Sequence, residues 1–486
     1  MQFKEFLQNN IVILDGGMGT MLQARGLGAG ELPERWNVSH PEVITEIHKL
    51  YYEAGSNVVS TNTFGANMFK FSEAELDEII GAAVANARAA EKAHREENAK
   101  IGIEKQTFVA LDIGPSGKLL EPMGTLSFDD AVEAYGKVVR IGAKYQVDLI
   151  YIETMNDCYE TKAALLAAKE NCDLPVMVSN AYGEGGRLMT GATPAAMVAM
   201  VESLGADAIG CNCSLGPKQL KSVVEALLEN ASIPVILKPN AGLPKVVDGK
   251  TTFDVLPDEF AEEVAALLQA GVGLVGGCCG TNPDYIAAVA EEVKKLDGQA
   301  KKCVKSVSDK TVVSSYSGTV AIGEEDVVIG NRIQPWSDEE IAGWIKEGAV
   351  DNLMDVAFDQ MDEDAQIIGV NVSDAEVMVE AVTSFQEMIR APFMLSSNNC
   401  KALEAGLRHY NGKPMMMVCD YSQEYLEEFF ALAGKYGAVV LVCKNDLSKE
   451  EIAGIAQKYG VLDKNLIIVQ ADYKDETITI PCVCQD

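Results

Sequence analysis

The first 300 residues alternate between short apolar runs rich in β-branched residues and longer stretches rich in Ala, Glu and Lys. The apolar runs lead into Gly- or Asn-containing turns, and helix-like segments such as AVANARAAEKAHREENAK lie between them. This alternation predicts parallel strand pairing. The eight runs are IVILDGG, NVVSTNTF, FVALDIGP, LIYIET, VMVSNAY, AIGCNC, PVILKPNAG and GLVGGCCG. Eight such units predict a closed (β/α)₈ TIM barrel, and an open doubly wound sheet is the alternative.

The alternation lapses at 298–320, where the chain is polar and rich in Ser and Lys, and we expect a linker there. It resumes over 321–486 with the runs DVVIGNRI, QIIGVNV, PFMLSS, KPMMMVCD, AVVLVCK and NLIIVQ. About six strands are too few to close a second eight-stranded barrel. The predicted organisation is a barrel over 1–297, a linker, and a smaller α/β domain, either a partial barrel or an open sheet.

Net charge and hydropathy limit the classes of partner that the chain can have. The 486 residues carry a formal net charge of −32, whereas binding to nucleic acid needs a basic surface. No apolar run approaches the roughly 20 residues of a membrane span, and the start MQFKEFLQNN lacks the pattern of a signal peptide. We therefore expect a cytoplasmic protein without nucleic-acid or membrane partners. In that reducing compartment, the twelve cysteines favour metal binding or catalysis over disulfides.

Three cysteines fall where the chemistry of a TIM barrel gathers, at the C-terminal ends of the strands. Cys213 ends the sixth run, and Cys278 and Cys279 end the eighth, so the three thiols can converge at one mouth. Three thiolates suit zinc, and a site with three protein ligands leaves a fourth position for water or substrate. Cysteine is also a frequent core residue, and we expect that role for Cys211.

A resemblance to a known family rests on the motifs LDGGMGTML, STNTFGAN, DIGPSG, YIETMNDCYETKAA, GCNCSLGP and GGCCGTNPDYI, in this order over about residues 5–295. Together they resemble the homocysteine S-methyltransferase family, in the version that forms the N-terminal module of cobalamin-dependent methionine synthase. The family fold is a (β/α)₈ barrel. The resemblance implies that Cys213, Cys278 and Cys279 bind Zn²⁺, which in turn binds the sulfur of homocysteine. Zinc would remove the proton of that thiol, whose free pKa is about 8.5, and leave a nucleophile.

The resemblance also assigns Asp15 and Glu153, at the ends of the first and fourth strands, to recognition of the amino acid. Glu153 could pair with the ammonium. Asp15 could do the same, or could orient the turn of Gly16 and Gly17, whose backbone N–H groups could meet the carboxylate. Turn formation is the alternative role for Asp15, and a favourable position at a helix N-terminus is the alternative for Glu153. Further expected residues are Asn62 and Thr63 in the wall of the site, and Asn212 holding the loop of Cys213.

Residues from about 326 to 470 faintly resemble the pterin-binding methyltransferase domain, through VVIGNRIQP, IIGVNVSDAEVMVEAV and NNCKALEAGLRHYNGKPMMM. The stretch MLSSNN lacks the acidic residue expected there, MMMVCD lacks the expected asparagine, and the family barrel has eight strands. These departures argue against a competent methyltetrahydrofolate site, and a degenerate docking or structural domain is the alternative. The residues left for pterin contacts are Asn331, Asn371 and Asp420.

The leading hypothesis is zinc-dependent methyl transfer to homocysteine, giving methionine. None of the four histidines lies in the Asp-x-His-x-x-Gly context of a cobalamin module. Methylcobalamin would therefore come from a separate corrinoid protein, or from a part of the polypeptide outside this sequence. One alternative is a small donor, S-methylmethionine or a betaine, without a corrinoid. Another is a non-catalytic docking adaptor in a corrinoid methyltransferase assembly, although an adaptor has no need of three converging thiols.

Overall fold

The computed structural model describes residues 2–247, 250–296 and 310–482. They fall into two compact units, Met1–Thr190 with Ala206–Val307, and Gly191–Gly205 with Ser308–Asp486. Within these described ranges, no helix combines the length and the apolar character that crossing a bilayer demands.

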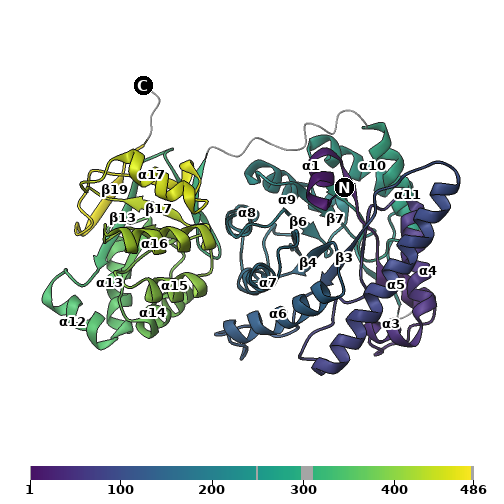
Figure 1. The fold of residues 1–486 in the computed structure, drawn as a ribbon, viewed down its shortest axis with the longest axis horizontal. Helices are drawn as coiled ribbons and strands as arrows, with labels where there is room; N and C mark the ends of the chain where they lie inside the picture. The colour runs from purple at the N-terminus through teal and green to yellow at the C-terminus, as the bar shows by residue number, and fades with distance from the viewer. Residues whose placement is uncertain (1, 248–249, 297–309, 483–486) are drawn as a thin grey trace. The chain divides into compact units, whose positions relative to one another are not determined.

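The first unit contains an eight-stranded parallel sheet in the order β1–β10–β7–β6–β5–β4–β3–β2, with helices around it (Figure 1). Asn57 N–H donates to Ile13 O (2.6 Å) and Ile13 N–H donates to Asn57 Oδ1 (2.9 Å), which nearly closes the sheet between β1 and β2. The predicted TIM barrel is confirmed, because each predicted run supplies one strand. These are β1 (Val12–Ile13), β2 (Val58–Ser60), β3 (Phe108–Ile113), β4 (Leu149–Met155), β5 (Val176–Asn180), β6 (Ala208–Asn212), β7 (Val235–Lys238) and β10 (Leu274–Val275).

Several of the helices between the strands begin at side-chain caps. Ser72 and Glu75 form a capping box at the start of α5, and Asp157 accepts a backbone N–H at the start of α7. A short hairpin, β8 (Lys245–Val247) and β9 (Lys250–Thr252), follows β7 and was not predicted. The helical segments of this unit are α2 (Met18–Ala24), η1 (Pro33–Arg35), α3 (Trp36–Ser39), α4 (Pro41–Ala54), α5 (Glu73–Lys100), α6 (Phe128–Lys144), α7 (Cys158–Asn171), α9 (Pro217–Asn230), α10 (Pro257–Ala270) and α11 (Pro283–Lys295). Helix α8 (Pro194–Ser203) lies between β5 and β6 in the sequence but belongs to the second unit.

The barrel interior is apolar at one end and polar at the other. Helix α1 (Phe3–Asn9) closes the N-terminal end, where Phe3 and Phe6 pack on Phe108 with ring centroids 5.3 and 5.5 Å apart. Alternate residues of a strand face the same side, so the interior rows continue into polar residues at the strands' C-terminal ends. The apolar row comprises Val12, Val58, Phe108, Ala110, Leu149, Tyr151, Met177, Ala208, Ile236 and Leu274. The polar row comprises Ser60, Asp112, Glu153, Ser179, Asn212 and Lys238, all buried.

The second unit is the predicted smaller α/β domain. Its sheet has the order β18–β17–β16–β15–β14–β13–β19, and the six predicted strands pair in parallel. They are β13 (Val327–Ile333), β14 (Ile367–Asn371), β15 (Phe393–Ser396), β16 (Met415–Met417), β17 (Val439–Val442) and β18 (Leu466–Ile468). The helical segments are α12 (Glu339–Glu347), α13 (Val350–Asp362), α14 (Ala375–Met388), α15 (Cys400–His409), α16 (Gln423–Tyr436), α17 (Lys449–Lys458) and η3 (Asp463–Asn465).

Two elements of this unit have no counterpart in the sequence prediction. Strand β19 (Thr477–Ile480) pairs antiparallel with β13 and covers an edge that would otherwise be free to pair with another chain. An antiparallel hairpin, β11 (Thr311–Ser314) and β12 (Thr319–Ile322), begins within the segment 298–320 predicted as a linker and ends just beyond it. The remainder of that segment, 298–309, lies outside the described residues.

Candidate metal centre and substrate site

The structure brings Cys213, Cys278 and Cys279 together at the C-terminal mouth of the barrel. Their Sγ atoms all lie within 4.8 Å of one another, and the Cys213 and Cys279 Sγ atoms are 3.8 Å apart. Sulfurs bound at ~2.3 Å to one tetrahedral zinc lie roughly 3.8 Å from each other. The donor set and its spacing therefore fit a single zinc ion. No second group of three or more metal-ligating side chains with this spacing occurs among the described residues.

An unusual backbone conformation aims the Cys213 thiol at the mouth. Asn212 faces the barrel interior, so a regular strand would turn both Cys211 and Cys213 away from it. Strand β6 ends at Asn212, and Cys213 and Ser214 take left-handed φ values of 59° and 58°. The Cys213 N–H donates to Lys238 O (3.1 Å). Cys211 stays in the strand, fully buried, and burial raises the pKa of its thiol to about 12.

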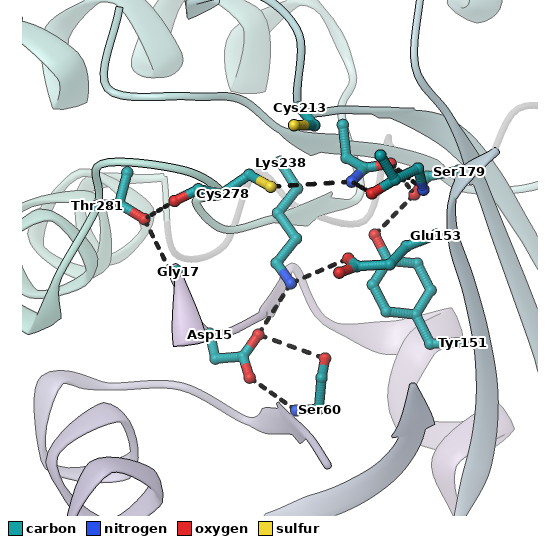
Figure 2. Close-up of polar contacts among 12 residues, drawn as sticks. Asp15, Gly17, Ser60, Tyr151, Glu153, Ser179, Cys213, Lys238, Cys278 and Thr281 are labelled. Atoms are coloured by element: carbon teal, nitrogen blue, oxygen red, sulfur yellow. Dashed lines mark hydrogen bonds and ion pairs between the residues drawn. The ribbon is translucent and has the colours of Figure 1, made fainter. Parts of the chain in front are cut away.

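Backbone contacts hold the loop that carries the other two cysteines. The Cys279 N–H donates to Asn240 Oδ1 (3.1 Å). Thr281 Oγ1 donates to Cys278 O (2.7 Å) and accepts the Gly17 N–H (3.1 Å). The hydroxyl of Thr281 thus ties the loop after β10 to the loop after β1 (Figure 2). It also accepts the Gly17 N–H, one of the two donors that were predicted for the substrate carboxylate.

Two glycines are required for this close approach of the loops. A Cβ on Gly277 would lie 2.4 Å from Thr281 Oγ1, and a Cβ on Gly17 would lie 2.7 Å from Cys278 O. Both distances are below ordinary van der Waals contact, so a side chain at either position displaces the cysteine loop. Gly16 is similarly confined, since its Cβ would meet Thr281 Oγ1 at 2.8 Å.

Hydrogen bonds among the three thiols shift their pKa values in opposite directions. Hydrogen bonds with Cys278 and Cys279 lower the pKa of Cys213 to about 3. The bond to Cys213 raises the pKa of Cys278 well above its ordinary value, and that of Cys279 to about 12. One thiolate is therefore stabilised by two neighbouring thiols, an arrangement in which a dication can replace the shared protons.

A buried ion cluster lies beside the cysteines. Lys238 Nζ is 3.0 Å from Asp15 Oδ1 and 3.2 Å from Glu153 Oε2, and 5.4 Å from the Tyr151 ring centroid (Figure 2). Burial alone would lower the pKa of Lys238, but Asp15 and Glu153 outweigh it and raise that pKa well above the ordinary value. Lys238 was not among the predicted site residues, although a charged residue directly after the apolar stretch of PVILKPNAG is a signal that could have indicated it.

The two predicted acidic residues have different surroundings. Asp15 Oδ2 accepts the Ser60 N–H (2.7 Å), and Oδ1 accepts from Ser60 Oγ (3.4 Å) and from Lys238. Both of its oxygens thus bind within the protein, across the seam between β1 and β2. Glu153 uses one oxygen for Lys238, and burial raises its pKa above the ordinary value despite that lysine. Glu153 is therefore the better placed of the two for a substrate group.

Asn212 connects the cysteines to β4. Its Oδ1 accepts the Thr154 N–H (2.8 Å) and the Ser179 hydroxyl (2.6 Å). Its Nδ2 donates to Thr154 Oγ1 (2.7 Å) and lies 4.0 Å from Cys278 Sγ. The buried amide thereby fixes the end of β4 and points a donor at one sulfur.

Asn62 and Thr63, predicted in the wall of the site, hold loops in the structure. Asn62 Nδ2 donates to Pro33 O (2.7 Å), and Thr63 Oγ1 donates to Asp112 O (2.7 Å). Both side chains are buried after β2. Their contacts join the loop after β2 to the segment of Pro33 and to the C-terminal part of β3.

The three candidate pterin residues of the second unit differ in their surroundings. Asn331 Nδ2 donates to the backbone oxygens of Tyr473 (3.2 Å) and Asp475 (2.9 Å), so the chain itself takes this donor. Asn371 ends β14 and is buried, and its Nδ2 has no hydrogen-bond partner among the described residues. Asp420 is exposed and accepts the Ser422 N–H (2.7 Å).

Comparison with known proteins agrees with this geometry. The family model described as homocysteine S-methyltransferase matches residues 12–293, more than half of the chain. The chain belongs to the homocysteine S-methyltransferase family. Its resemblance to that family in sequence, and the barrel expected from it, are both confirmed.

Relatives match beyond the barrel as well. Methionine synthase from Mycobacterium tuberculosis is 28% identical over 496 residues, covering 95% of this chain and 40% of the relative. Methionine synthase from Mycobacterium leprae is 28% identical over 506 residues, covering 96% and 41%. The chain therefore spans about two fifths of the length of these relatives. The metallated homocysteine methyltransferase MmuM from Escherichia coli shares the fold, with a TM-score of 0.51 and 24% identity over 60% of this chain and 98% of that one.

Proposed function

We propose that this chain transfers a methyl group to the thiol of homocysteine, forming methionine, with Zn²⁺ held by Cys213, Cys278 and Cys279. The observation that carries the proposal is the convergence of three sulfurs within 4.8 Å of one another at the mouth of the barrel. Three protein ligands leave one position of a tetrahedral ion for the substrate thiol. Bound there, zinc would lower the pKa of that thiol and present it as a thiolate at neutral pH.

The chain's own residues would bind and orient the amino acid. Glu153, with one oxygen committed to Lys238, would accept the substrate ammonium. Asp15 and Lys238 would act as positioning residues, because they fix Glu153 and connect it through the Lys238 carbonyl to Cys213. Holding the thiol in line with the methyl donor is then the remaining contribution to the rate. A cytoplasmic location would keep the three cysteines reduced.

The donor we propose is methylcobalamin, carried by a corrinoid protein or by polypeptide outside this sequence. The second unit supports this donor over S-methylmethionine or a betaine, since it resembles the domain that follows the barrel in cobalamin-dependent methionine synthase. We do not assign methyltetrahydrofolate to this unit, because backbone oxygens of Tyr473 and Asp475 take the amide donor of Asn331.

The test is a single-turnover assay with the zinc-loaded chain, homocysteine and free methylcobalamin, followed by cobalamin absorbance and by methionine formation. S-methylmethionine and betaine are offered in parallel as donors. Cys278→Ala should lose most of its zinc and its product, while Cys211→Ala, which removes a buried thiol outside the triad, should keep both. Full zinc content and activity in Cys278→Ala would remove the triad from the reaction, and product from a small donor alone would remove the corrinoid.

A further inference from the structure

Lys238 pairs with two acids of the barrel interior, Asp15 and Glu153, and a third acid, Asp112, lies near them without an ion pair to any residue that the structure describes. Asp112 lies on β3 and continues the interior row of Phe108 and Ala110 toward the C-terminal mouth. It is 6% exposed, and its Oδ1 has no hydrogen-bond partner among the described residues. Thr61 Oγ1 accepts the backbone N–H of Asp112 (3.1 Å), but that bond leaves the carboxyl group untouched.

Asp112 stands next to the residue proposed to bind the substrate. Strand β3 pairs with β4 so that Asp112 lies opposite Tyr151, and Glu153 follows two residues nearer the mouth. Parallel neighbours lie about 4.8 Å apart, so the two carboxyl groups project into the same part of the interior. Lys238 contacts Glu153 and Asp15 and forms no ion pair with Asp112 in the described part of the chain.

The charges around Asp112 in the barrel interior do not balance. The charged groups that face Asp112 are Glu153, Lys238, Asp15 and Glu34, three acids and one base. Burial, and then the charge of Glu153, raise the pKa of Asp112 well above its ordinary value. Such an orphaned buried carboxyl costs free energy unless a cation or a donor meets it. A metal ion would need more ligands than this cluster brings to one point, since the cysteine triad is the one group with that spacing among the described residues.

We propose that Asp112 is the second carboxyl of an ammonium subsite and, with Glu153, receives the α-ammonium of the amino-acid substrate. The inference rests on the proposed function, in which that substrate is homocysteine. The subsite lies next to the cysteines because Lys238, which anchors Glu153 through its side chain, accepts the Cys213 N–H through its backbone oxygen. On binding, the Asp112 carboxylic acid gives its proton to solvent and the resulting carboxylate pairs with the ammonium.

The decisive variant is Asp112→Asn in the full chain, which keeps the shape of the side chain. The variant is assayed with two methyl-accepting thiols, homocysteine and 4-mercaptobutyrate. The second has the same thiol and carboxylate but no ammonium, so a loss confined to homocysteine reports on ammonium binding. Losing a charged hydrogen bond should lower kcat/KM for homocysteine about 10- to 100-fold, chiefly through KM. The value for 4-mercaptobutyrate should stay unchanged. Equal losses with both acceptors, or none with homocysteine, would overturn the proposal.

The matched control is Asp148→Asn, at the opposite end of the barrel. Asp148 accepts from Arg88 (2.8 Å) and from the Val109 N–H (2.7 Å), far along the strand from the mouth. This variant should leave the preference for homocysteine over 4-mercaptobutyrate intact. If Asp148→Asn lost the preference for homocysteine as Asp112→Asn does, the loss would reflect a general disturbance of β3 and not the ammonium subsite.

Calorimetric binding in buffers of different ionisation enthalpy gives a readout that needs no turnover. The wild-type chain should release one proton more with homocysteine than with 4-mercaptobutyrate, and Asp112→Asn should release equal numbers. Equal release by the wild type would overturn the Asp112 proposal even if methionine forms. An ammonium-dependent proton release without any methyl transfer would instead uphold the subsite and refute the proposed function.

Discussion

Replacing Lys238 with methionine removes the cation from a buried group of carboxylates and leaves the side-chain volume nearly unchanged. Lys238 and Asp15 are each 3% exposed at the side chain, and Glu153 is 9% exposed. Breaking a buried pair by removing one partner costs about 3–5 kcal/mol, because the remaining charge stays buried without compensation. For a domain of this size we expect the thermal midpoint of the barrel to fall by roughly 5–8 °C near pH 8.

The pH dependence of this loss has a definite sign. The folded pKa of Lys238 lies above its ordinary value, so its stabilisation is complete at neutral pH and is lost only as the pH rises through that raised value. In Lys238→Met the uncompensated carboxylates can instead be neutralised by protonation, and burial already raises the pKa of Glu153. The deficit relative to wild type should therefore shrink as the pH is lowered from 8 to 5.5.

Scanning calorimetry of wild type, Lys238→Met and Lys238→Met/Glu153→Gln at the two pH values measures both effects. The double variant should recover part of the lost midpoint, since it removes one of the two orphaned charges. Lys245→Met is the matched control, because Lys245 forms an exposed ion pair with Asp254 and should leave the midpoint unchanged. A wild-type midpoint for Lys238→Met at both pH values would refute the reasoning.

Two other substitutions test the packing of the loops and of the second unit. Gly277→Ala should weaken zinc retention in a competition with a chelator, because its Cβ would lie 2.4 Å from Thr281 Oγ1 and shift the loop of Cys278; unchanged retention would contradict the required close approach. Burial lowers the pKa of Lys413 to about 8, so up to pH 8 the folded chain bears the cost of a buried charge. Lys413→Met should stabilise the second unit by roughly 1–2 kcal/mol at pH 7, because relief of the buried charge outweighs the lost hydrogen bond to Asn465 Oδ1, and the gain should fade toward pH 10; a gain that does not vary with pH would contradict this.

The barrel was predictable because each strand begins in a β-branched apolar run and each helix follows a Gly- or Asn-containing turn. The elements that escaped prediction are those with little such signal. The hairpin residues Thr311–Ser314 lie in a polar, Ser-rich stretch, and β19 is a short segment that pairs antiparallel at an edge. The pairing of β19 with β13 depends on contacts between residues far apart in the sequence, and a local sequence pattern does not predict such contacts.

The residues of the candidate site were likewise only partly predictable from the sequence. The motif Gly-Gly-Cys-Cys-Gly and Cys213 were singled out because cysteines at strand ends are rare and chemically specific. The orientation of Cys213 was not predictable, since it depends on left-handed backbone at Cys213 and Ser214. Lys238 and Asp112 were also missed, because one charged residue in an apolar run acquires meaning only when the barrel register places it beside other charges.

Zinc-edge X-ray absorption of the zinc-loaded chain, with and without homocysteine, tests the central claim most directly. We predict three sulfur neighbours at ~2.3 Å without substrate and a fourth when homocysteine is added. The Cys278→Ala chain should not reach four sulfurs under the same conditions. Fewer than three sulfur neighbours in the wild-type chain, or a coordination shell that homocysteine leaves unchanged, would contradict the account.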